Sequence, residues 1–265
     1  MIGFCPLASG SKGNCTYFAS KNTRILIDVG ISTRLLEKRL DELGVGLDTI
    51  DAILITHEHI DHIRGLPVLL KKRDIPVLTN SETARAIYQT IGTCPRFKLF
   101  TTGEPFEFGD LKINPFSVQH DAADPVMFTI EAEGVKFGFC TDLGFVSTLV
   151  ASQLRGANYL VIEANHQPSM VHACSRSPVY KQRVLGRLGH LSNEECARTL
   201  LDIHHDGLKH VHLAHLSSEC NNPELALQIV KEHLLTHGKE VEIAIAYQEK
   251  ISKQIPFHTF SVSPS

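Results

Sequence analysis

Thr56-His57-Glu58-His59-Ile60-Asp61-His62 places three imidazoles and an aspartate within six residues. The apolar run just before it, residues 51–56, predicts a buried strand that ends where the cluster begins. Imidazole nitrogen and carboxylate oxygen are the ligands that borderline divalent metals prefer. Because the spacing His-x-His-x-Asp-His is far more specific than a single His, it favours a metal site over a polar turn that is rich in His by chance.

Four further candidate side chains each follow an expected strand. They are Asp28 after residues 24–27, His120 after 116–118, Asp142 after 137–141 and His215 after 211–214. Strand ends meet along one edge of a sheet in layered α/β proteins, and sites are built there. Any one of these residues alone would be read as an ordinary surface residue. Together with residues 57–62 they predict one composite site.

The rest of the chain has the composition of an ordinary globular protein. Its 265 residues are 43% hydrophobic and 21% charged, which favours one large domain over residues 1–265. Short strand patterns come first, and strands and helices alternate in the second half. This order predicts an α+β fold of two mixed sheets with helices outside, an αββα four-layer sandwich. Glu133-Gly134 is expected to be a two-residue turn, and Ser192 with Glu195 a helix-capping box.

Charge and cysteine content narrow the class of protein. With 26 Lys and Arg against 29 Asp and Glu, the net charge of −3 argues against overall attraction to nucleic acid. Seven Cys without a CxxC pair predict a reduced compartment and no disulfide framework. We expect a cytoplasmic protein, because neither a signal peptide nor a membrane span is encoded. The oligomeric state is left open.

One local basic cluster stands out against this acidic balance. It consists of Arg176, Lys181, Arg183 and Arg187. Such a cluster is either a solvated face or a set of contacts to a polynucleotide backbone.

The chain resembles the metallo-β-lactamase-fold hydrolases through five successive motifs, which are spread over nearly the whole sequence. The motifs are Asp28, residues 57–62, His120, Asp142 and His215. More narrowly, the chain resembles the YycJ/WalJ-type branch of that family. That resemblance rests on residues 8–14, 56–59, 120–122, 141–144, 163–166, 189–193 and 214–217. The branch usually carries an Asp where this chain has Gln167.

The resemblance implies two divalent metal ions. One would lie on His57, His59 and His120, the second on Asp61, His62 and His215, and Asp142 would bridge them. Counting donors agrees, since each ion then has four protein contacts and room for a bridging hydroxide. Such a pair suits the hydrolysis of a phosphodiester. Zn is the expected metal, and without a Cys ligand Mn and Fe remain alternatives.

The family also implies roles for neighbouring residues. Asp61 would orient the hydroxide or take its proton, and Asp28 would support the motif loop by hydrogen bonds. Glu163 and His190 resemble a pair in related tRNA-processing nucleases, so His190 is expected to be a leaving-group acid or a phosphate clamp.

Substrate contacts are expected from two short segments. In the Gly/Ser loop, Lys12 and Asn14 are candidates, although a plain turn explains this loop equally well. Asn165 and His166 are the other candidates. For His166 the alternative is that it supports the site by a hydrogen bond and does not contact the substrate.

The leading functional hypothesis is a metal-dependent phosphodiesterase that acts on nucleic acid. The branch resemblance implies a 5′-to-3′ exonuclease with DNA as substrate. Only 21 positions separate Asp142 from Glu163, which excludes the large inserted cap domain of RNA-degrading relatives. The alternatives are a hydrolase of a small phosphodiester, thioester or lactam, and a non-catalytic metal-binding protein with a regulatory partner.

Overall fold

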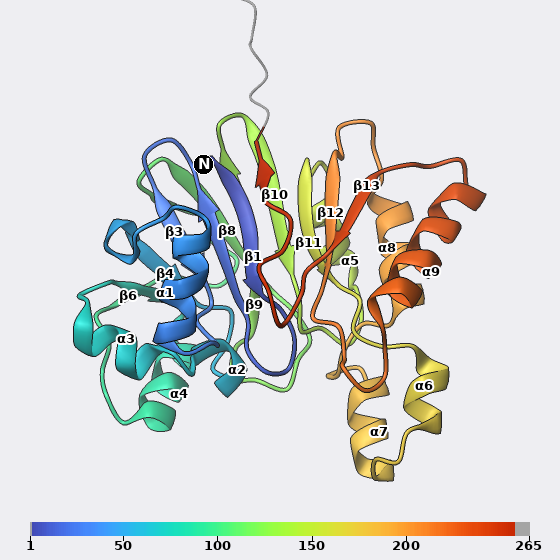
Figure 1. The fold of residues 1–265 in the computed structure, drawn as a ribbon, viewed down its shortest axis with the longest axis horizontal. Helices are drawn as coiled ribbons and strands as arrows, with labels where there is room; N and C mark the ends of the chain where they lie inside the picture. The colour runs from blue at the N-terminus through green and yellow to red at the C-terminus, as the bar shows by residue number, and fades with distance from the viewer. Residues whose placement is uncertain (1, 258–265) are drawn as a thin grey trace, which may run out of the picture.

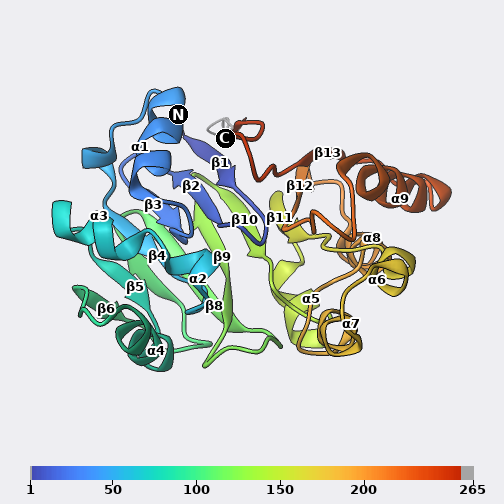
Figure 2. The ribbon, with the colours of Figure 1, turned by 60° about the horizontal axis from the view of Figure 1, so that its bottom comes forward.

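Two β-sheets face each other at the centre of the computed structural model, which describes residues 2–257 (Figure 1). The domain expected over 1–265 therefore includes residue 1 and residues 258–265, which lie outside the described residues. Each sheet has seven strands among the described residues. Helices cover the outer face of both sheets (Figures 1 and 2), so the predicted αββα sandwich is confirmed.

The first sheet takes all but one of its strands from the N-terminal part of the chain. In spatial order the strands are β14 (Ile255–Pro256), β1 (Gly3–Ala8), β2 (Cys15–Ala19), β3 (Arg24–Ile27), β4 (Ala52–Leu54), β5 (Val77–Thr79) and β6 (Phe97–Leu99). Pairing is antiparallel from β14 to β3 and parallel from β3 to β6. Its outer helices are α1 (Thr33–Glu42), α3 (Leu66–Lys72) and α4 (Ser81–Ile91). Ser32 caps α1 and Asn80 caps α4, each by accepting a backbone hydrogen bond.

The second sheet is built in the same way from the rest of the chain. In spatial order it contains β13 (Glu242–Ile245), β12 (His210–Ala214), β11 (Tyr159–Glu163), β10 (Val135–Cys140), β9 (Val126–Ala132), β8 (Leu111–Ser117) and β7 (Phe106–Phe108). Strands β10 to β13 run parallel. Helices α5 (Thr148–Leu154), α8 (Asn193–Ile203) and α9 (Pro223–Thr236) connect them and cover the outer face.

Aromatic side chains fill the space between the sheets. Phe4 and Phe18 of the first sheet pack against Phe137 of the second, with ring centroids 4.7 Å and 5.1 Å apart. A separate apolar cluster, which includes Leu36 and Ile53, lies between the first sheet and its helices. Burial of these side chains is the main favourable term that holds the four layers together.

The local turn and cap predictions are confirmed. Glu133 and Gly134 both have positive φ, at 54° and 73°, and they join β9 to β10 as a two-residue turn. The Ser192 side chain accepts from the Glu195 backbone and starts α8. The Glu195 carboxylate pairs with Arg198, so of the predicted capping box the Ser192 half is the part observed.

Several short elements were not predicted from the sequence. They are η1 (Leu47–Thr49), α2 (Ile60–Ile63), α3, β5, β7, β14, α6 (Pro168–Ala173) and α7 (Pro178–Leu185). Most contain too few residues to show a clear apolar period. The pair α6–α7 lies away from the helical layers, at the lower end of the second sheet in Figure 1. Within residues 2–257, no helix is long and apolar enough to cross a membrane.

Candidate metal centre

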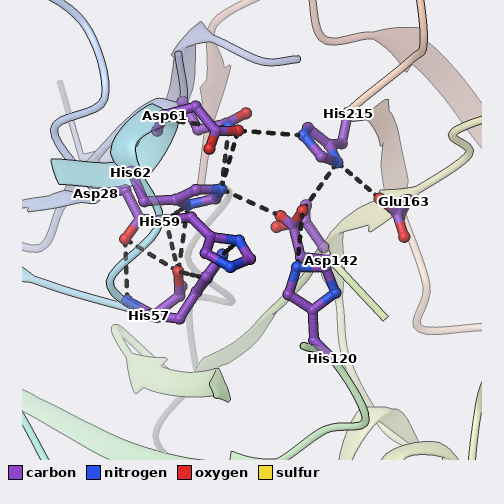
Figure 3. Close-up of polar contacts among 12 residues, drawn as sticks. Asp28, His57, His59, Asp61, His62, His120, Asp142, Glu163 and His215 are labelled. Carbon is purple, nitrogen blue, oxygen red and sulfur yellow. Dashed lines mark hydrogen bonds and ion pairs between the residues drawn. The ribbon is translucent and has the colours of Figure 1, made fainter. Parts of the chain in front are cut away.

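The predicted metal donors and Asp28, the residue predicted to support them, lie close together (Figure 3). They follow five different strands: Asp28 after β3, residues 57–62 after β4, His120 after β8, Asp142 after β10 and His215 after β12. The structure brings every one of them into a single cluster, as the convergence of strand ends predicts.

Three of these residues turn the chain sharply as their strands end. Asp28, Asp142 and His215 have backbone φ angles of 59°, 55° and 53°. This left-handed region is uncommon for residues other than glycine, and it persists only where the surroundings hold the backbone in place. Such positions cluster at active sites. Here they coincide with two predicted donors, Asp142 and His215, and with the predicted supporting residue Asp28.

Two loops of the first sheet hold the 57–62 segment from one side. The Asn14 backbone N–H donates to the Asp61 carbonyl at 2.7 Å, and Gly30 donates to the Asn14 carbonyl at 2.7 Å. A Cβ atom on Gly30 would lie 1.5 Å from the Asp61 carbonyl oxygen, so only glycine allows this approach. The buried Asn14 side-chain nitrogen also lies 3.1 Å from His62 Nε2. Asn14 therefore contacts the candidate ligands directly.

His57, His59 and His120 form the first donor group, and their ligand atoms lie within 4.8 Å of one another. His57 Nε2 and His59 Nδ1 face each other at 3.1 Å. The other ring nitrogen of His59 donates to the Asp121 carbonyl at 3.2 Å, which leaves a lone pair on Nδ1. His120 Nδ1 donates to the Gly189 carbonyl at 3.2 Å, so its Nε2 also keeps a lone pair.

Thr56 and Asp28 determine which nitrogen of His57 is protonated. Thr56 Oγ1 lies 2.9 Å from Asp28 Oδ2 and donates its proton to that carboxylate. The hydroxyl therefore accepts from His57 Nδ1 at 2.9 Å, and His57 Nε2 carries a lone pair. Two lone pairs that face each other, on His57 and His59, repel unless a cation lies beside them. The first donor group thus fits a bound metal ion.

Asp61, His62 and His215 form the second donor group. Asp61 Oδ2 lies 3.6 Å from His62 Nε2 and 3.8 Å from His215 Nε2. The Nδ1 atoms point away to carboxylates: His62 to Asp28 at 2.8 Å and His215 to Glu163 at 2.7 Å. His215 Nε2 is buried without a hydrogen-bond partner, which is costly unless an ion or a water binds there.

Asp142 lies between the two donor groups, as Figure 3 shows. Its Oδ2 is 3.4 Å from His62 Nε2, and its Oδ1 is 3.9 Å from His120 Nε2. The carboxylate is buried, and Oδ2 has no hydrogen-bond partner. Its Oδ1 also lies 3.2 Å from His215 Nδ1, so the carboxylate is close to members of both groups, as a shared ligand would be.

The electrostatics of the two groups differ. Burial and the neighbouring imidazoles lower the pKa of His57 well below its usual value, and burial lowers the pKa of His120. Burial would also lower the pKa of His215, but the facing carboxylates, chiefly that of Asp142, outweigh it and raise the pKa well above the usual value. Imidazole must be neutral to bind a metal, and the lowered pKa values of His57 and His120 favour that form.

Glu163 connects His215 to His190. Its Oε1 accepts from Nδ1 of both rings, at 2.7 Å and 3.0 Å, and its Oε2 accepts from the backbone of Leu143 and Leu191. Burial alone would raise the pKa of Glu163, but the two imidazoles hold it well below its usual range. Sequence analysis paired Glu163 with His190 and did not predict the contact with His215.

A cleft of about 390 Å³ opens onto the donor groups. Four of the predicted substrate or catalytic residues line it: Lys12, Asp61, Asn165 and His190. Asn165 is buried and donates to the His215 carbonyl at 2.7 Å, whereas Lys12 is exposed and pairs with Glu249 at 3.3 Å.

His166 and Gln167 lie apart from the residues that line this cleft. His166 is buried, its Nδ1 has no hydrogen-bond partner, and burial lowers its pKa to about 4. Gln167 bonds to Glu194 at 2.7 Å and to Asn193 at 3.3 Å. The replacement of the usual Asp by Gln167 therefore leaves the donor groups intact.

Sequence analysis did not single out Asp121 as a site residue. Its Oδ1 lies 3.4 Å from His120 Nε2 and 3.9 Å from His59 Nε2, and its Oδ2 accepts from Arg183 at 2.7 Å. Its position directly after His120 was the signal that could have identified it.

We expect Asp28→Asn to weaken metal binding by about 10- to 100-fold, because the amide nitrogen cannot accept from His62 Nδ1. Asn tolerates the left-handed backbone at this position, so the fold should survive. Zn²⁺ affinity would be measured by competition with a chelator. Asp51→Asn is the matched control, since Asp51 accepts from Arg24 N at the start of β3, whereas Asp28 follows the other end of that strand. Equal affinities of the two variants would contradict the role of Asp28.

Comparisons with known proteins agree with this geometry. A family model described as a beta-lactamase superfamily domain matches residues 23–215. The chain is 37% identical over 239 residues to exodeoxyribonuclease YycJ of Bacillus anthracis, covering 89% of this chain and 90% of the relative. It is 37% identical over 224 residues to exodeoxyribonuclease WalJ of Streptococcus pneumoniae serotype 2, covering 83% of each.

Solved structures show the same fold at low sequence identity. The metallo-β-lactamase fold protein YhfI of Bacillus subtilis superposes with a TM-score of 0.72 at 16% identity, covering 94% of this chain and 98% of that one. The short form of human tRNase Z superposes with a TM-score of 0.64 at 16% identity, covering 97% and 100%. The resemblance predicted from the motifs is confirmed, and the chain belongs to the β-lactamase superfamily and, within it, to the YycJ/WalJ branch of metal-dependent hydrolases.

Proposed function

We propose that the protein is an exonuclease that hydrolyses phosphodiester bonds of DNA in the 5′-to-3′ direction with two divalent metal ions. The observation that carries the proposal is the inward-facing donor set, with Asp142 between two groups of three side chains. The choice of DNA is supported by the two relatives, which are named exodeoxyribonucleases and match over most of the chain.

The donor groups assign the ligands of each ion. His57, His59 and His120 would hold one ion, and Asp61, His62 and His215 the other, with Asp142 shared. Bound there, the ions would lower the pKa of a water molecule and stabilise the charge that develops on the phosphate. Imidazole and carboxylate donors suit Zn, and Mn and Fe are the alternatives.

Two side chains of the protein would orient the reacting groups and transfer protons. The Asp61 carboxylate is partly exposed and lines the cleft, so it can orient the attacking water and accept its proton. On the leaving side, Glu163 holds His190 by a 3.0 Å hydrogen bond, and His190 lines the same cleft. We assign His190 to donate a proton to the departing oxygen.

The proposal also includes the location of the protein in the cell and its organisation as one domain. A cytoplasmic location is supported by the seven Cys, all of which are free thiols. Action of the chain as one domain is supported by the aromatic core, which packs both sheets against each other.

The test is to follow a linear duplex DNA with a 5′-phosphate and an internal label, with wild-type protein reconstituted with Zn²⁺ or Mn²⁺. We expect progressive shortening that starts at the 5′ end, and none with a chelator. Internal cuts would contradict the exonuclease assignment. Intact DNA with hydrolysis of bis(p-nitrophenyl) phosphate would favour a small phosphodiester as the substrate, for which a cleft of about 390 Å³ also has room.

A further inference from the structure

The α6–α7 arm, residues 168–185, forms one wall of the cleft. The arm projects beyond the lower end of the second sheet (Figure 1). Its Val171 and Val184 pack against Cys220, in the loop that follows His215. Arg176 and Arg183 of this arm line the cleft together with the candidate ligands. The arm therefore places two basic side chains, which are not candidate ligands, beside the metal centre.

The structure divides the basic cluster found in the sequence into two pairs. Lys181 donates to the His172 carbonyl at 2.7 Å, and the Arg187 guanidinium lies over the Phe145 ring at 4.1 Å. Neither is among the residues that line the described cleft. Arg176 and Arg183 do line it, so these two are the candidates for contact with a substrate.

Each of these two arginines is held beside a loop that carries a candidate ligand. Arg183 Nε donates to Asp121 at 2.7 Å, and Asp121 directly follows His120. Arg176 Nε donates to Glu219 at 2.8 Å, in the loop after His215, and a second nitrogen of Arg176 also contacts this carboxylate. The two guanidiniums thus lie near different parts of the donor cluster.

Both ion pairs are open to exchange with a substrate. The side chains of Arg176 and Arg183 are 52% and 62% exposed, and ion pairs in contact with water contribute little to stability. A guanidinium binds a phosphate in the same forked geometry as a carboxylate. The backbone advances by roughly 9 Å along α7 from Ser177, the residue after Arg176, to Arg183. Successive nucleotides of a strand are about 3.4 Å apart along the axis, so the two arginines can reach different phosphates.

We propose that Arg176 and Arg183 bind two backbone phosphates of the DNA strand that enters the cleft, and so place the scissile phosphate at the metal centre. Glu219 and Asp121 hold the guanidiniums in position until the phosphates displace them. The inference rests on the proposed function, since it takes DNA as the substrate.

The test compares two double variants that remove the same charge from the same basic cluster, Arg176, Lys181, Arg183 and Arg187. The probe is a fluorescent, 5′-phosphorylated single strand of about 12 nucleotides with phosphorothioate linkages. Its affinity is measured between about 50 and 200 mM NaCl. Arg176→Ala with Arg183→Ala should bind about tenfold or more weakly, and the slope of log K against log[salt] should fall by about 1.4, or 0.7 per lost contact. Lys181→Ala with Arg187→Ala should keep the slope of the wild type.

Glu219→Gln separates a phosphate-binding role from a structural one. If Arg176 binds phosphate, loss of the competing carboxylate tightens DNA binding, whereas Arg176→Ala weakens it. If the ion pair only supports the fold, both changes weaken binding alike, and that result would overturn the proposal. Equal slopes of log K against log[salt] for the two double variants would also overturn the proposal.

Measuring both DNA cleavage and DNA binding allows a failure of this proposal to be distinguished from a failure of the proposed function. The ratio of kcat/KM for DNA to kcat/KM for bis(p-nitrophenyl) phosphate should fall tenfold or more in the Arg176/Arg183 variant, because the small ester cannot reach both arginines. A wild type that binds the strand but never cleaves DNA contradicts the proposed function alone. A wild type that binds no DNA overturns both.

Discussion

Asp61→Ala should reduce turnover of DNA by about 10³-fold or more while the protein stays folded. The substitution removes a candidate ligand of the second group and also the group assigned to take the proton of the attacking water. General base catalysis alone contributes about 10²- to 10⁴-fold. The Asp61 side chain is 24% exposed, so its loss leaves no large buried cavity.

Three measurements check this expectation: kcat on DNA, metal content per chain and circular dichroism. We expect metal content to fall from two ions toward one, because only His62, His215 and the shared Asp142 would remain to hold the second ion. Glu58→Gln is the matched control from the same motif, since Glu58 accepts from Ala123 N and is absent from the donor groups. A folded Asp61→Ala protein that kept substantial activity would refute the assignment.

His190→Ala should reduce kcat on DNA by about 10²- to 10⁴-fold without loss of metal. The expected cause is loss of the proton donor to the leaving oxygen, since His190 lines the cleft and is oriented by Glu163. A p-nitrophenolate group leaves without protonation. The same variant should therefore lose far less activity on bis(p-nitrophenyl) phosphate than on DNA.

The two substrates separate the possible roles of His190. If His190 instead bound a phosphate, His190→Ala would raise KM for both substrates to a similar extent. A residue that only packs would leave kcat on DNA near the wild-type value with unchanged metal content. Either pattern would exclude His190 as the leaving-group acid.

Strand ends and spacing were enough to predict the candidate ligands. The run His57-x-His59-x-Asp61-His62 covers the loop after β4 and the start of α2, so its spacing can be recognised within one short segment of sequence. His120, Asp142 and His215 each end a strand whose apolar run is visible in the sequence. Because parallel strands share an edge, their order along the chain predicted their meeting in space.

Other features depend on contacts between distant segments. The link from Glu163 to His215 joins side chains 52 positions apart, and the ion pair from Arg183 to Asp121 spans 62 positions. The spacing of apolar and polar residues along the sequence does not predict contacts between side chains so far apart. The α6–α7 arm was also missed, because its two helices are short and make only a small apolar cluster of their own.

The amino-acid sequence by itself determined the four-layer fold, the family and the donor set, since each depends on local pattern and on strand order. The tertiary structure alone decided which nitrogen of each imidazole faces inward, because that depends on Asp28, Glu163 and the carbonyls of Gly189 and Asp121. It also decided which basic side chains reach the cleft. Burial and hydrogen bonding across the fold set both outcomes, and neither follows from residue spacing.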